Sequence, residues 1–158
     1  MAREGLNDLR KYEAALRRRA ASGATAILGL ALESLEHGRV VFSMRVKPKH
    51  KQLQGVVHGG ILATLADTVA AIAAYTTVPK DTHIATVEMN INFLEPVADG
   101  QIRAEARVLR TGRNFVATEC EIFTAKGSMV AKALLTFGAA RGHSISKSTA
   151  RDARTIRT

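Results

Sequence analysis

The chain of 158 residues has few of the residues that build covalent or aromatic sites: one cysteine, three prolines, no tryptophan and 4% aromatic residues in all. The lone thiol, Cys120, has no partner for an internal disulfide, and we expect it to be a small buried apolar residue. The scarcity of aromatic rings argues against a stacking platform for single-stranded nucleic acid.

Several catalytic and cofactor motifs are also missing. No G-x-S-x-G is present, so a serine-hydrolase elbow is not supported. The five histidines show neither H-x-x-x-H nor paired-cysteine spacing, and no dinucleotide or P-loop glycine pattern occurs. We therefore expect no metal and no cofactor.

The sequence does not predict a targeting or membrane segment. Residues 1–19 mix acidic with basic side chains and lack an apolar stretch, unlike a secretory signal or an organellar transit peptide. The longest apolar segment, 58–76, is too short to cross a bilayer well and carries Asp67 in its middle. We expect a cytoplasmic protein without a membrane partner.

Positive charge is abundant, and the net charge of +9 gathers toward the two ends of the chain. Charge alone supports only nonspecific attraction to nucleic acid. A solvated basic surface is therefore the favoured reading, with specific nucleic-acid binding as its alternative.

The length and the hydrophobic content of 46% suffice for one globular domain with its own core. The predicted division is a basic N-terminal helix (1–24), one domain (25–140) and a basic, disordered tail (141–158).

The first half of the domain contains strands and one long helix. Alternating apolar residues predict a strand over 39–46, buried on one face, which a turn at 37–38 joins to an earlier strand near 28–35. Ahead of these, helical spacing over 7–21 predicts a short amphipathic helix. The segment 58–76 is apolar on nearly every face and predicts a helix wrapped by other protein.

From residue 84 onward the pattern is β. Alternation and hairpin-like breaks predict four strands, at 84–93, 101–110, 114–124 and 128–137. One long helix followed by an antiparallel meander predicts an α+β fold in which the sheet curls around the helix.

Asp67 needs an explanation, because a carboxylate within an apolar helix costs several kcal/mol unless it has partners or a task. No basic residue lies three or four positions away. Two readings are open: Asp67 accepts structural hydrogen bonds at a subunit contact, or it is catalytic.

The start of the same helix, His58-Gly59-Gly60, favours the catalytic reading. Backbone N–H groups at a helix N-terminus attract an anion or a polarised carbonyl oxygen, as in an oxyanion hole. A Gly-Gly helix start alone is weak support, since a tight loop or close packing also explains it. Gly59 and Asp67 are eight residues apart, or ~12 Å along a helix axis. If both act on one carbonyl group, they come from two subunits, so the hypothesis requires a homodimer.

The run GVVHGGILATLAD (Gly55–Asp67), followed by VEMNINFLEPV (Val87–Val97), resembles the hotdog-fold thioesterase superfamily, in its phenylacetate-degradation type. Helix start, carboxylate spacing and following strand match in order, and with the later strands the resemblance covers about residues 25–139. It implies a hotdog fold, a curved antiparallel sheet wrapped around one long central helix. It also implies an acyl-CoA thioesterase that forms a homodimer or homotetramer, with coenzyme A as part of the substrate.

The resemblance also assigns catalytic roles. Gly59 would polarise the thioester carbonyl, and Asp67 of the partner subunit would be nucleophile or general base. Gln52, six residues before the histidine, would orient the carbonyl or the water. Thr86 would hold the water, although the loop before it is one residue longer than in some relatives. Some relatives use a threonine one turn after the carboxylate, where this chain has Ala71.

Further residues are implied to bind the substrate. His58 and Gly60 belong to the helix start, where a structural role for His58 is favoured over a general base. Arg110, Arg113 and Asn114 stand near where relatives bind the nucleotide part of coenzyme A, and Lys126 and Lys132 are possible additions. Each of these charges is equally a solvated strand-edge charge.

The acyl group is open, with aryl and short or medium chains as candidates. The competing function is a non-catalytic acyl-CoA binding or sensing protein of the same fold. A hotdog dehydratase is weaker, because its histidine–carboxylate pattern is not found.

Overall fold

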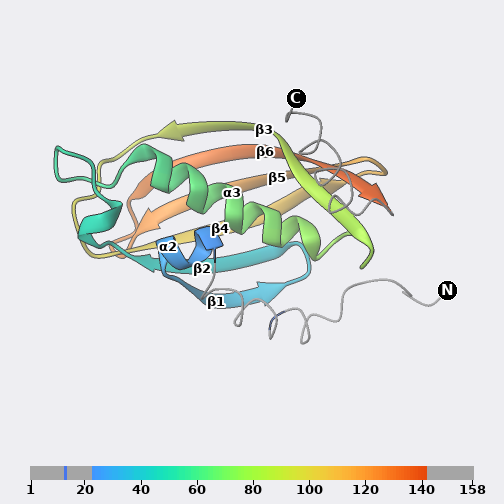
Figure 1. Ribbon diagram of the computed structural model, residues 1–158, viewed down its shortest axis with the longest axis horizontal. Coiled ribbons are helices and arrows are strands. Elements are labelled where there is room, and N and C mark those ends of the chain that lie inside the picture. The colour runs from blue at the N-terminus through green and yellow to red at the C-terminus, as the bar shows by residue number, and fades with distance from the viewer. Residues whose placement is uncertain (1–12, 14–22, 142–158) are drawn as a thin grey trace, which may run out of the picture.

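The computed structural model describes residue 13 and residues 23–141 (Figure 1). The basic helix predicted at 7–21 and the tail beyond residue 141 lie outside the described residues, apart from Glu13. The elements in chain order are α2 (Gly23–Leu28), β1 (Leu30–Glu36), β2 (Arg39–Arg45), the 3-10 turn η1 (Pro48–His50), α3 (Gly59–Tyr75), β3 (Thr82–Phe93), β4 (Gln101–Thr111), β5 (Phe115–Thr124) and β6 (Met129–Arg141).

The strands form one antiparallel sheet in the order β1-β2-β4-β5-β6-β3. Figure 1 shows α3 lying across this curved sheet, with β1 and β3 at its two edges. The predicted α+β arrangement is therefore confirmed. Among the described helices, none is long and apolar enough to span a membrane.

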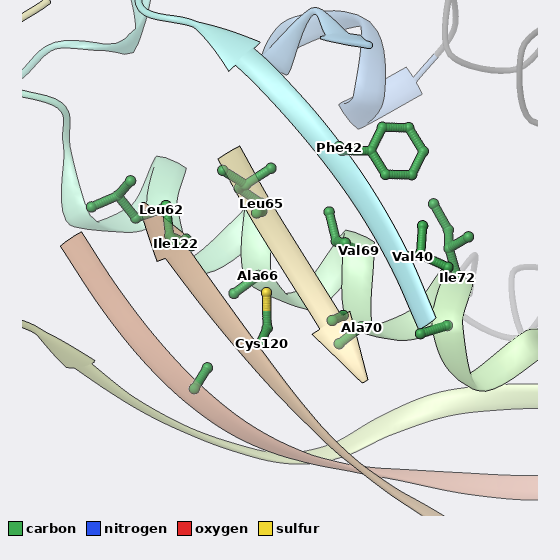
Figure 2. Packing of buried hydrophobic residues seen from close by; sticks show 14 of the residues in the cluster. Val40, Phe42, Leu62, Leu65, Ala66, Val69, Ala70, Ile72, Cys120 and Ile122 are labelled. Carbon is green, nitrogen blue, oxygen red and sulfur yellow. The ribbon is translucent and has the colours of Figure 1, made fainter. Parts of the chain in front are cut away.

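The core lies between α3 and the sheet. Alternation along β4, β5 and β6 turns a mixture of small and larger side chains toward the helix, with alanines and Cys120 among the small ones. Small residues let the helix approach the sheet closely. A row of buried residues along α3 packs against them (Figure 2). That row consists of Leu62, Leu65, Ala66, Val69, Ala70, Ile72, Ala73 and Ala74. Cys120 is buried as predicted, and burial raises the pKa of its thiol to about 12.

Within the described part of one chain, the sheet leaves one side of the helix open. Thr64 is exposed, and Asp67, Thr68 and Ala71 are only partly buried. These positions recur at helical spacing, so they form a single stripe along α3. The stripe combines polar and small residues, whereas the buried row is aliphatic.

The first predicted strand begins too early. Residues up to Leu28 belong to α2, and Gly29, with φ of 65°, accepts the left-handed conformation that ends a helix. Its N–H donates to the Thr25 carbonyl at 2.9 Å, as in a helix C-terminal cap. The strand therefore starts at Leu30, after this glycine.

Strand β2 is buried on both faces, although its alternation predicted one. Val40, Phe42 and Met44 join the core as expected, but Val41 and Ser43 are also at most 5% exposed. Alternation reports which residues face the core, but it does not report what covers the opposite face.

A β-bulge interrupts β3. Thr86 pairs with Phe137, but Glu88 pairs with Thr136, so Val87 is an extra residue. Strict alternation along the strand would place Thr86 on the face opposite Met89. The bulge places both on the inner face, because their partners Phe137 and Leu135 are both core residues.

Candidate functional site

The first turn of α3 presents one backbone donor that has no partner among the described residues. His58 is the N-cap residue, and its ring Nδ1 accepts a hydrogen bond from the Gly60 N–H at 2.8 Å. The Gly60 N–H is therefore already used in this hydrogen bond and is not free for a ligand. The Gly59 N–H donates to no group within the described part of the chain. Of the two glycines, Gly59 is the one whose N–H remains available at the positive end of the helix.

A pocket of about 350 Å³ adjoins this donor. Gln52 and Gly59 both line it, so the structure brings together two residues that are seven positions apart in the sequence. The remaining walls are mostly apolar and include Leu62 of α3 and Phe93 at the end of β3. Figure 1 shows why: the end of β3 and the start of α3 lie at the same end of the sheet.

Phe93 packs directly on Gly59. A methyl group placed on the Gly59 α-carbon would lie 3.3 Å from the Phe93 Cζ atom, tighter than an ordinary contact. Glycine therefore allows the aromatic ring to approach the helix start closely. The sequence analysis missed Phe93 as a site residue. Its position four residues before the buried Val97, in the strand after the helix, carries no local signal of this contact.

The second part of the site is the Asp67–Thr86 pair. The Thr86 hydroxyl donates to Asp67 Oδ1 at 2.7 Å, across the gap between α3 and β3. Within the described residues no Lys or Arg lies within ion-pair distance of Asp67. In the described part of the chain the carboxylate is thus oriented by a neutral hydroxyl and has no basic partner.

We expect Thr86→Val to lower kcat by roughly 10–100-fold, because a hydrogen bond to a charged group contributes about 1.5–3 kcal/mol. Thr86→Ser keeps the hydroxyl and is expected to stay within a few-fold of the wild type. Steady-state kinetics on any thioester that the protein cleaves checks this. Equal rates for the valine and serine variants would show that the hydroxyl plays no part.

The predicted nucleotide-binding residues lie at the opposite end of α3. Arg113 and Asn114 line a pocket of about 560 Å³ with Val78 and Pro79, which follow the helix. Arg110 lines a neighbouring pocket of about 380 Å³, to which Arg113 and Asn114 also belong. Because α3 has 17 residues, this end is about 25 Å from Gly59 in the same chain. Within one chain, these arginines therefore lie too far from the Gly59 N–H to bind the same part of a ligand.

The basic residues of the sheet and of its β4–β5 turn differ in how they are paired. Arg110 and Arg113 form no ion pair with the described residues. Lys132, in contrast, binds Glu121 at 2.7 Å and Glu119 at 3.2 Å, and these carboxylates raise its pKa. Lys132 is therefore already neutralised by its strand neighbours and is a poorer phosphate ligand than the sequence alone indicated.

Comparison with known proteins identifies the family. The model of the thioesterase superfamily matches residues 54–131, a range that contains Gly59, Asp67 and Thr86. Human acyl-coenzyme A thioesterase 13 is 31% identical over 109 residues, which cover 67% of this chain and 77% of that protein. The chain belongs to the thioesterase superfamily.

Two further comparisons agree with a thioesterase. A protein of Saccharolobus solfataricus, provisionally named an esterase, is 36% identical over 107 residues, covering 68% of this chain and 76% of that protein. The crystal structure of a Haemophilus influenzae thioesterase superposes with a TM-score of 0.76 at 25% identity, covering 80% of this chain and 88% of that chain. The predicted hotdog fold and the class of thioester hydrolase are confirmed.

Proposed function

We propose that this thioesterase hydrolyses acyl-CoA to the free acid and coenzyme A. The observation that carries the proposal is the Gly59 N–H at the start of α3, which has no partner among the described residues and lines the same pocket as Gln52. A donor fixed there can stabilise the negative charge that develops on a thioester carbonyl oxygen. Gln52, across the same pocket, can orient the carbonyl or the attacking water.

Asp67 supplies the second half of the chemistry. As a general base it takes a proton from water while the oxygen attacks the carbonyl carbon. As a nucleophile it attacks that carbon itself, and water then hydrolyses the anhydride. In both routes the carbon–sulfur bond breaks, coenzyme A leaves as the thiol, and Thr86 holds the carboxylate in position.

The proposal requires two subunits. Gly59 and Asp67 lie ~12 Å apart along one helix, too far to touch the same carbonyl group. Two features support self-association as a homodimer or homotetramer: the partly exposed stripe along α3, and the outer edge of β3, which pairs with no other described strand. In a two-fold pair of antiparallel α3 helices, the partner subunit's Asp67 approaches Gly59. The same symmetry brings the partner subunit's Arg113 toward the Gly59 end.

Coenzyme A as the carrier is supported by the name of the human relative and by Arg110 and Arg113. Their guanidinium groups lack ion-pair partners in the described chain and suit phosphate. The acyl group is proposed to be aryl or of short to medium length, as in the phenylacetate-degradation type. His58 and Gly60 serve mainly by shaping the helix start.

The test is release of free coenzyme A thiol from a panel of aryl and aliphatic acyl-CoA thioesters. Turnover of at least one member is expected from the purified full chain. A folded protein that binds acyl-CoA by calorimetry and releases no thiol from any member would instead be the non-catalytic binding protein.

A further inference from the structure

His50 is an ionisable residue in an unusual position. It is 0% exposed, although it lies in the short turn η1, between β2 and the loop that carries Gln52. A buried polar ring is stable only if both of its nitrogen atoms have partners. Neither the catalytic nor the substrate-binding roles proposed above use this residue.

Both ring nitrogens are bonded. The Lys47 N–H donates to His50 Nδ1 at 3.2 Å, so Nδ1 is an acceptor and the ring proton is on Nε2. Nε2 lies 3.1 Å from the Ile27 carbonyl oxygen, to which it donates. Through its side chain, His50 thus joins the end of α2 to the segment that follows β2.

The backbone of the same residue closes the loop that presents the site. The His50 carbonyl accepts the N–H of His58, the N-cap of α3, at 2.9 Å. Between these two residues the chain forms a small hairpin: Lys51 bridges Val57, and the Gln52 N–H donates to the Val56 carbonyl at 2.9 Å. His50 therefore fixes the base of the hairpin from which Gln52 projects and to which Gly59 is attached.

We infer that His50 is a positioning residue, which holds Gln52 at the pocket through the base of this hairpin. The inference rests on the proposed function for its effect on catalysis. The structural half of the inference is that the His50 ring holds the hairpin in place. This half does not depend on any reaction.

The kinetic test is a double-mutant cycle with Gln52→Ala, using His50→Leu. In the wild-type background we expect His50→Leu to lower kcat about tenfold with little change in KM, because a net hydrogen bond is lost at each nitrogen. In the Gln52→Ala background the same substitution is expected to change kcat less than twofold. Equal losses in both backgrounds would mean that His50 does not act through Gln52 and would overturn the inference.

A second variant covers the case in which His50→Leu does not fold. His50→Asn keeps an acceptor for the Lys47 N–H and loses the bond to Ile27. The same cycle is then expected to give a smaller loss of about threefold that is again absent beside Gln52→Ala. His37→Asn, in the exposed β1–β2 turn, is the matched control and should leave kcat unchanged.

Amide hydrogen exchange tests the structural half without any turnover. In His50→Asn the amides of Gln52, Gly55 and His58 should exchange about tenfold faster, while the buried α3 amides keep their protection. Unchanged protection of the hairpin would overturn the inference. Absence of turnover by the wild type would overturn the proposed function and leave this readout decisive.

Discussion

Asp67→Asn is expected to reduce kcat by ~10²–10⁴-fold, the usual contribution of a general acid or base. The change keeps the size of the side chain and an oxygen that can accept from the Thr86 hydroxyl, so only the negative charge and the basicity are lost. KM should change little, since the carboxylate acts on the water or the carbonyl carbon and does not bind the carrier. Thiol release under saturating acyl-CoA measures the effect.

The control is Asp99→Asn, which removes a carboxylate from the exposed loop before β4 and should leave kcat unchanged. Thermal unfolding of both variants separates catalysis from stability. If Asp67→Asn turns over at the wild-type rate, the carboxylate is a structural acceptor for Thr86 and the catalytic assignment fails.

Gly59→Pro is expected to cost ~10²–10³-fold in kcat relative to Gly59→Ala, the range measured when one oxyanion donor is removed. Proline deletes the N–H and yet fits the first position of a helix. The preceding residue also suits proline, because His58 already has φ of −66° and ψ of 134°. The helix should therefore form in both variants, and the ratio of their kcat values measures the N–H alone.

Gly59→Ala is the matched control because its new methyl group meets Phe93 just as the proline ring does. Phe93 is 53% exposed and can shift outward, so we expect only a moderate loss for alanine. Equal kcat values for the two variants, with circular dichroism showing intact helix, would remove the Gly59 N–H from the mechanism.

The long helix and the meander were predictable because their patterns are local. The apolar period from Gly59 to Tyr75 and the alternation along β4 to β6 each lie within one element, and the structure has both where the sequence put them. The sequence also showed that the Gly59 N–H and the Asp67 carboxylate lie on one helix, eight residues apart.

Contacts between elements were not predictable in the same way. The bulge at Val87 changes which face of β3 carries Thr86. The residue types around Val87 do not predict a bulge. The packing of Phe93 on Gly59 joins residues far apart in the sequence and depends on the loop lengths between them. His50 is similar: a polar residue in a short turn gave no sign that its ring would be buried and fully bonded.

The burial of Cys120 has a practical consequence. With its thiol buried under α3 and its pKa raised to about 12, the folded protein has almost no thiolate to react with a colorimetric disulfide reagent. This residue is also the only cysteine of the chain. In an assay with such a reagent, the signal from native enzyme therefore comes from released coenzyme A. A slow extra signal of one equivalent per chain would report unfolding.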